Sequence, residues 1–95
     1  MSDTLVIIPA FNEEKNIVNV IKRLTSTLSD TDYVIVNDGS IDNTSKICKE
    51  KAFNIIDLPV NLGLAGAFQT GMKYAHKHGY KYAVQFDGDG QHRPE

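Results

Sequence analysis

The sequence has few of the features that mark secreted, membrane-embedded or nucleic-acid-binding proteins. Cys48 is its only cysteine, so no disulfide can form within the chain, which fits a reducing cytoplasm. The longest apolar run, residues 5–10, is far too short to span a bilayer, and residues 1–20 lack the cationic start of a signal peptide. The net charge of −2 and the lack of any basic run argue against nucleic acid as a partner. We expect a cytoplasmic location, and membrane association of a longer parent protein stays open.

The composition is that of a small soluble domain. Hydrophobic residues make up 41% of the chain and charged residues 23%, which is ordinary for a globular protein. With 95 residues the chain forms one domain at most, residues 1–95, and its core is thin.

Apolar runs and helical spacings alternate along the chain. Short apolar runs at residues 5–8, 33–36, 54–58 and 82–86 predict strands. Between them lie three predicted helices: one capped by Asn12 with Glu13 and Glu14 in its first turn, one over residues 42–51, and one stopped by Gly79. The order β-α-β-α-β-α-β predicts an α/β fold with a Rossmann-like, mostly parallel sheet.

The apolar positions predict which face of each helix is buried. The first helix should bury Ile17, Val20, Ile21, Leu24 and Leu28, the second Ile47 and Cys48, and the third Leu64, Phe68, Met72 and Ala75.

Polar residues follow the carboxyl end of each predicted strand. Residues 11–13, 37–39, 61–63 and 87–89 all occupy such positions. In open parallel sheets ligands bind beyond this edge, so we expect the chemistry of the protein there.

Asp87 and Asp89 are the strongest candidates for metal ligands. They stand two residues apart on a turn with Gly88 and Gly90, and Gln91 adds an amide oxygen. Such hard oxygen ligands suit Mg²⁺ or Mn²⁺, and the glycines allow a phosphate to come close. A metal here would stabilise a diphosphate leaving group. The alternative is a solvated acidic turn.

Two other loops are less specific. Asp38 could accept hydrogen bonds from a ribose hydroxyl or a base, or it could simply form a turn with Gly39. The small residues 61–67 could admit a nucleotide or pack a helix closely on the sheet, and Gly71 favours packing. The first strand–helix turn has no glycine and carries two acids, which disfavours pyrophosphate binding there.

Taken together, four segments resemble the family 2 glycosyltransferases with the GT-A fold. These are residues 8–14 (IPAFNEE), 36–44 (VNDGSIDNT), 61–63 (NLG) and 87–95 (DGDGQHRPE). The details are similar to the branch that contains dolichol-phosphate mannose synthase and polyprenyl-phosphate glycosyltransferases. The chain would be the donor-binding half of such an enzyme.

The resemblance implies a donor, a metal and a set of site residues. The donor would be a nucleotide-diphosphate sugar, a UDP- or GDP-sugar, and the cofactor Mn²⁺ or Mg²⁺. The nucleotide-sugar site would comprise Pro9, Ala10, Phe11, Glu13, Asp38, Gly63, Asp87, Gly88 and Asp89. Asp89 would be the main metal ligand, with Asp87 and Gln91 beside it. Phe11 stands where the family usually has Tyr, which keeps the ring and removes a hydroxyl.

Members of this family are usually at least twice as long as this chain. Part of the reaction is therefore not assigned to residues 1–95. The acceptor would be a polyprenyl phosphate, and a general base would lie after Glu95. Two alternatives remain: a scaffold that self-associates through surfaces exposed in so short a chain, and a phosphatase with an Asp nucleophile. The position of the acidic pair after the fourth strand disfavours the phosphatase.

Overall fold

The computed structural model describes residues 3–28 and 31–86 of the chain. In chain order the elements are β1 (Thr4–Ala10), α1 (Ile17–Thr27), β2 (Asp32–Asn37), α2 (Thr44–Glu50), β3 (Ile55–Asp57), α3 (Gly63–Lys77) and β4 (Tyr82–Gln85). This order confirms the predicted α/β alternation. The second helix and the third strand are each shorter than predicted.

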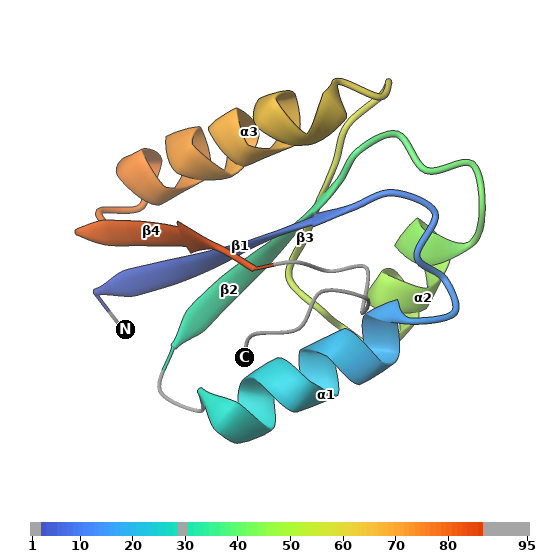
Figure 1. Ribbon diagram of the computed structural model, residues 1–95, viewed down its shortest axis with the longest axis horizontal. Coiled ribbons are helices and arrows are strands. Elements are labelled where there is room, and N and C mark those ends of the chain that lie inside the picture. The colour runs from blue at the N-terminus through green and yellow to red at the C-terminus, as the bar shows by residue number, and fades with distance from the viewer. Residues whose placement is uncertain (1–2, 29–30, 87–95) are drawn as a thin grey trace.

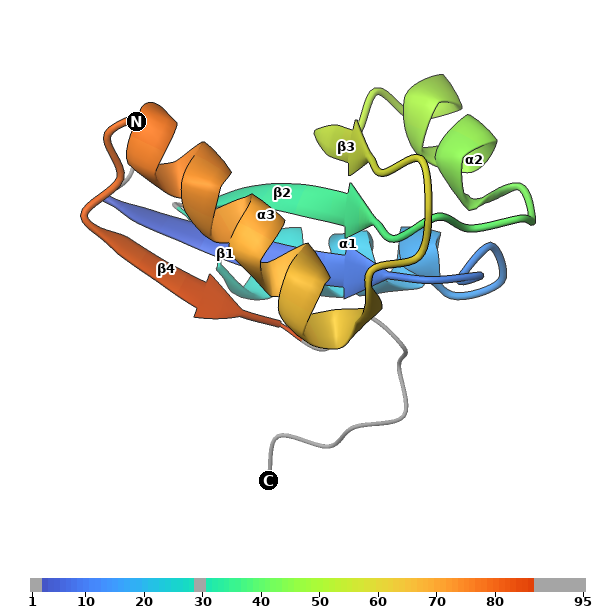
Figure 2. The same cartoon turned by 90° about the horizontal axis from the view of Figure 1, so that it is seen from above.

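The described strands form one parallel sheet in the order β3-β2-β1-β4. Helix α3 covers one face of this sheet, and α1 and α2 lie on the other (Figures 1 and 2). Within the described residues, no helix combines the length and the hydrophobicity that a membrane span requires.

Strand β1 lies in the middle of the sheet and is buried on both faces. Val6, Ile8 and Ala10 join the core on the side of α1, whereas Leu5 and Ile7 join the core on the side of α3. This period of two explains the continuous apolar run in the sequence, because each alternate residue meets a different helix layer.

Helix α1 begins later than the sequence predicts. Its first residue is Ile17 and its N-cap is Asn16, so Asn12 is not the cap and no acid lies in the first turn. Asn12 instead has φ 54°, in the left-handed region that asparagine tolerates better than most residues. The predicted stripe is otherwise confirmed from Ile17 to Leu24, whereas Leu28 is 42% exposed.

The buried face of α3 is only partly the predicted one: Ala75 is buried and Phe68 packs against the core, as predicted. The helix buries Ala67, Gly71 and Ala75. Leu64 and Met72, by contrast, are 61% and 44% exposed. A Cβ at Gly71 would lie 2.4 Å from Ile7 Cγ2, so the absence of a side chain there is what lets the helix approach the sheet. Gly79 follows the helix with φ 80°, which confirms it as the stop signal.

Tyr80 ties the start of β4 to the start of β2. Its hydroxyl donates a hydrogen bond to Asp32 Oδ2 at 2.7 Å. Burial, followed by the hydrogen bond and the charge of Asp32, raises the pKa of Tyr80 from 10.0 to about 12.

This raised pKa predicts a loss of stability in alkali. Above pH 10 the unfolded chain releases the tyrosine proton that the native state still holds, so stability fully present below pH 10 declines toward pH 12. We expect Tyr80→Phe to cost about 1 kcal/mol near neutral pH and to flatten this decline. Urea unfolding at a series of pH values measures both effects, with Tyr82→Phe, at a 63% exposed tyrosine, as the control. An unchanged alkaline decline in Tyr80→Phe would contradict the assignment.

Candidate functional site

The carboxyl ends of three strands lie level with one another at one edge of the sheet. Ala10 of β1 pairs with Asn37 of β2, and Asn37 pairs with Asp57 of β3. Beside them, the Phe86 amide donates to the Ile7 carbonyl at 2.8 Å, so β4 runs toward the same edge. The loops after β1, β2 and β3 therefore meet, as the sequence predicts, and the segment after β4 lies outside the described residues.

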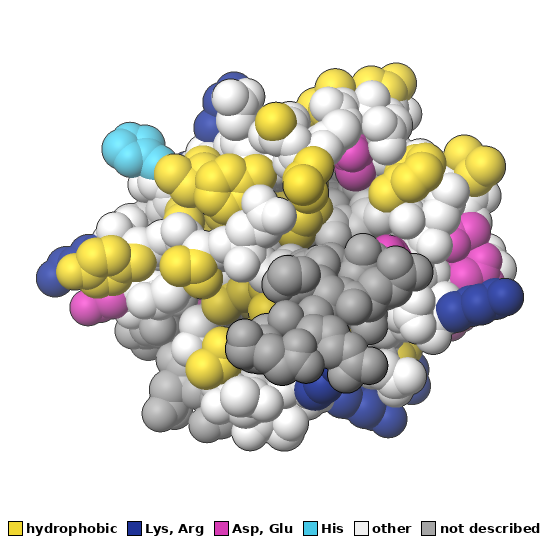
Figure 3. All heavy atoms as spheres, in the orientation of Figure 1, with side chains coloured by type: hydrophobic (Ala, Val, Ile, Leu, Met, Phe, Trp, Pro, Cys, Tyr) yellow, Lys and Arg dark blue, Asp and Glu magenta, His cyan; other side chains and the backbone are white. Residues whose placement is uncertain are grey.

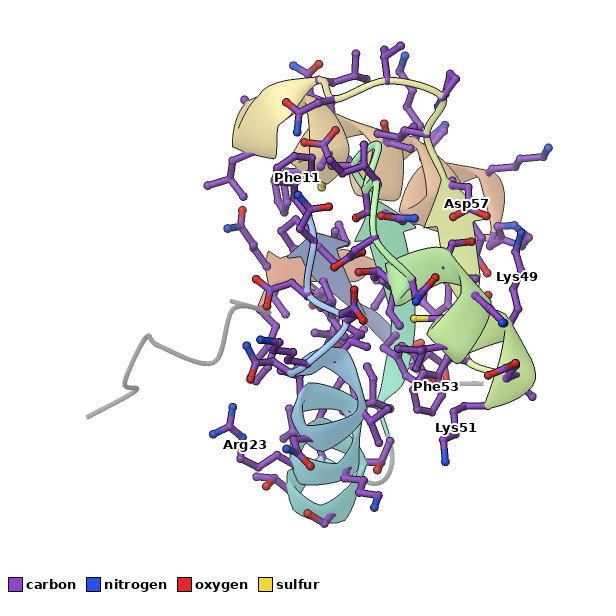
Figure 4. The ribbon with its side chains drawn as sticks, turned by 90° about the vertical axis from the view of Figure 1, so that its right-hand side faces the viewer. Phe11, Arg23, Lys49, Lys51, Phe53 and Asp57 are labelled. Atoms are coloured by element: carbon purple, nitrogen blue, oxygen red, sulfur yellow. The ribbon has the colours of Figure 1, made fainter. Side chains whose placement is uncertain are left out.

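Pro9, Ala10 and Phe11 are the site residues predicted on β1. Ala10 is buried, and its carbonyl accepts the Asp38 amide at 2.8 Å. Pro9 pairs with Val36 of β2. On the other side of β1, strand β4 ends at Gln85, which pairs with Ile7, so Pro9 lies beyond the described part of β4. The ring of Phe11 is 46% exposed at the tip of β1 (Figure 4), which leaves it accessible to a ligand.

Asp38 joins the loop after β2 to the start of α3. It is only 4% exposed, and its Oδ1 and Oδ2 accept the Leu62 and Gly63 amides at 2.7 and 3.0 Å. Asn61 Nδ2 in turn donates to the Asp38 carbonyl at 3.1 Å. The carboxylate thus caps α3 from another loop, where the helix dipole favours a negative charge.

This cap is a role that the sequence interpretation missed. The only signal was the asparagine and glycine of residues 61–63, which do not reveal their partner. The hydrogen bond that Asp38 would accept from a nucleoside stays a prediction. It is compatible with the cap, because each carboxylate oxygen has a second lone pair.

Asn37 and Asp57 form a second polar group that the sequence did not assign. Asn37 Nδ2 donates to Asp57 Oδ1 at 2.9 Å, and Asp57 Oδ2 accepts Ser45 Oγ at 3.0 Å and Lys49 Nζ at 2.9 Å (Figure 4). Burial alone raises the pKa of Asp57, but these contacts outweigh it and lower the pKa below 3.8. This carboxylate is therefore ionised and fixes the ends of β2 and β3.

Glu13 lies in the loop between β1 and α1. Its carbonyl accepts the Asn16 and Ile17 amides at 3.0 and 2.8 Å, and its Oε1 accepts Asn16 Nδ2 at 3.3 Å. These bonds shape the entry into α1. A contact between Glu13 and a nucleoside stays a prediction.

The loops at this edge carry an excess of negative charge. Residues 11–16, 38–43 and 58–62 contain the acids Glu13, Glu14, Asp38 and Asp42 and a single basic residue, Lys15. They cannot neutralise a diphosphate by themselves, so an anionic ligand would need a cation supplied from elsewhere.

The predicted metal ligands Asp87, Asp89 and Gln91, together with Gly88, lie outside the described residues. Within residues 3–28 and 31–86, no group of three His, Cys, Asp or Glu side chains could hold a metal ion. The carboxylate and amide oxygens of the predicted set do suit Mg²⁺ or Mn²⁺ in their chemistry.

A parallel sheet with helices on both faces and polar loops at the carboxyl ends of its strands defines the class of open-sheet α/β proteins, in which ligands bind at that edge. The family model described as Glycosyl transferase family 2 matches residues 5–95. The chain therefore belongs to glycosyl transferase family 2, as the four sequence segments predict.

Relatives with assigned names support this membership. The chain is 43% identical, over 114 aligned positions, to the UDP-N-acetylglucosamine–dolichyl-phosphate N-acetylglucosaminyltransferase of Methanococcus voltae, with 100% of this chain and 45% of that protein covered. It is 32% identical over 98 positions to the polyprenol monophosphomannose synthase of Mycolicibacterium smegmatis, with 97% and 37% covered. The chain thus spans less than half the length of these relatives.

Solved structures share the fold. Staphylococcus aureus TarS, residues 1–349, superposes with a TM-score of 0.76 at 24% identity, covering 94% of this chain and 28% of that one. The glucosyl-3-phosphoglycerate synthase of Mycobacterium tuberculosis, in complex with UDP, gives 0.71 at 23% identity, covering 90% and 33%. Both confirm a GT-A type of α/β fold.

Proposed function

We propose that this chain supplies the donor-binding and metal-binding site of a glycosyltransferase. The reaction transfers a sugar, with inversion, from a nucleotide-diphosphate donor to a polyprenyl phosphate. The observation that carries this proposal is the meeting of the loops after β1, β2 and β3 at one sheet edge, in a chain that belongs to glycosyl transferase family 2.

The nucleoside would lie against the tips of β1 and β2. Phe11 offers an exposed ring for stacking on a base, and Asp38 offers carboxylate lone pairs for a base N–H or a ribose hydroxyl. Asp38 is held by Leu62 and Gly63, so it is fixed before the donor arrives. A UDP-sugar is favoured, since the Methanococcus voltae relative is named for UDP-N-acetylglucosamine.

A divalent cation would be held by Asp87, Asp89 and Gln91, and when bound it would neutralise the diphosphate as the leaving group. The excess of acids in the neighbouring loops makes such a cation necessary. These loops would orient the donor with its anomeric carbon open to attack on the face opposite the diphosphate.

The acceptor is inferred from the names of both relatives, one of which names dolichyl phosphate and the other the product polyprenol monophosphomannose. The second pKa of a phosphate monoester is about 6, so its oxygen is already ionised at neutral pH. Such an acceptor needs little help from a general base, and we assign none to residues 1–95.

We expect Asp89→Asn to abolish most of the metal-dependent binding of UDP. Removing a metal ligand should weaken nucleotide affinity by at least about tenfold in the presence of Mn²⁺ and leave metal-free binding unchanged. Isothermal titration calorimetry with UDP and GDP, with and without Mn²⁺, measures this. Asp3→Asn, at the opposite end of β1, is the control. A folded wild-type chain that binds neither nucleotide at millimolar concentration would overturn the proposal.

A self-associating scaffold is the second candidate, because an apolar surface is exposed over α3 and β4 (Figure 3). Met72, Tyr82 and Val84 are 44%, 63% and 49% exposed, and β4 is at the edge of the described sheet. An unpaired edge and exposed apolar side chains favour association. Light scattering distinguishes the candidates: a tight oligomer that loses its nucleotide affinity on association would favour the scaffold.

A further inference from the structure

The loop after β1 and the loop after β2 are joined by hydrogen bonds from three consecutive amides. Asn12 N donates to Ser40 Oγ at 2.9 Å, Glu13 N to Thr44 Oγ1 at 2.9 Å, and Glu14 N to Asp42 Oδ2 at 3.2 Å. We call the side chains of Ser40, Asp42 and Thr44 the brace. Each brace residue is 28 to 31 positions away in sequence from its partner.

Bonds in the opposite direction close the same contact. Asn12 Oδ1 accepts the Ile41 amide at 2.9 Å, and Glu14 Oε1 accepts the Asn43 amide at 3.4 Å. The left-handed conformation of Asn12, with φ 54°, is therefore held from both its amide and its side chain.

The brace is itself anchored in the sheet. Ser40 Oγ donates to Asn37 Oδ1, and Asn37 is 4% exposed at the end of β2. Thr44 is fully buried, and its hydroxyl donates to Asp42 Oδ1. Each hydroxyl thus donates one bond and accepts one, so neither is free to turn toward another partner.

These bonds also decide what the first loop can bind. Three adjacent amides before a helix would otherwise form a site for an anion. In this chain the brace occupies all three, which agrees with the argument from charge that pyrophosphate does not bind there. The loop instead presents the exposed Phe11 ring at the tip of β1.

We propose that Ser40, Asp42 and Thr44 are positioning residues, which hold residues 11–14 in the shape that the nucleoside meets. They act through the backbone of the first loop and do not contact the donor themselves. This inference rests on the proposed function, because it concerns the same donor site. It adds residues that neither the sequence interpretation nor the comparisons assign.

The test replaces the Thr44 hydroxyl by a methyl group of the same size. We expect Thr44→Val to speed amide hydrogen exchange at residues 12–14 by about tenfold or more and to weaken UDP binding with Mn²⁺ by about tenfold. Thr44→Ser restores the hydroxyl and should recover both values. Thr70→Val is the matched control, since it removes a hydroxyl that donates to Gly66 O within α3.

The two readouts separate this inference from the proposed function. If the wild-type chain binds no nucleotide, the proposed function fails, and with it the positioning role, whereas exchange still shows whether the brace holds the loop. Unchanged exchange at residues 12–14 in Thr44→Val would overturn the brace. Faster exchange with unchanged UDP affinity would overturn its positioning role. Should Thr44→Val not fold, Ser40→Ala, at a half-buried position, is judged by the same two measurements.

Discussion

We expect Gly39→Ala to be one of the most destabilising single substitutions in the chain, with a cost of about 2–5 kcal/mol. Gly39 has φ 72°, where a side chain is strained. A Cβ there would lie 2.5 Å from Asn61 N and 2.6 Å from Val60 C. Both atoms belong to the backbone, so the neighbouring loop as a whole would have to move. Urea unfolding measures the loss.

Gly79→Ala is the control that separates the backbone strain of a positive φ from the clash of a Cβ with the neighbouring loop. Gly79 has a similar φ of 80°, but a Cβ there would meet no atom of residues 3–28 and 31–86 within 4 Å. It should therefore show only the conformational cost, about 1–2 kcal/mol. Hydrogen exchange at Leu62 and Gly63 should rise in Gly39→Ala alone, because the displaced loop releases the Asp38 carboxylate. Equal losses in the two variants would show that the loop contact is unimportant.

The second large effect is expected for Asp38→Ala, with a loss of about 2–4 kcal/mol. The substitution removes a buried carboxylate that accepts two backbone amides at the start of α3. Leu62, the N-cap residue of α3, has no side chain that could replace it. The first turn of the helix would therefore lose its partner and fray.

The stability of Asp38→Asn should lie between that of Asp38→Ala and that of the wild type, because one side-chain oxygen remains to accept a hydrogen bond. Glu50→Ala removes an exposed carboxylate from α2 and should change stability by less than about 0.5 kcal/mol. Thermal unfolding ranks the three variants by stability. If Asp38→Ala were as stable as Glu50→Ala, the cap described above would contribute nothing to stability.

The layered fold was predictable because its signals are local in sequence. The apolar run of β1 and the helical spacing of Ile17, Val20, Ile21 and Leu24 each reflect a periodicity that a few residues reveal. The buried face of α3 was predictable only in part. The sequence indicated that Gly71 packs on the sheet and that Ala75 is buried, but it did not show that this close approach leaves the large side chains of Leu64 and Met72 exposed.

The candidate site shows the same division. The sequence indicated which residues follow each strand, and parallel topology alone brings those positions to one edge. It did not show that Asp38 caps α3 or that Asn12 bonds to the loop of Ser40. Asn12 looked like a helix cap because asparagine fits caps and left-handed turns equally well.

The sequence by itself therefore determined the order of the elements, the family of the chain and the edge of the sheet where its polar loops gather. Only the tertiary structure decided which side chains hold the loops, because those partners lie more than twenty residues apart. A hydrogen bond between two loops depends on the distance between them in space, and a local pattern in the sequence carries no record of that distance.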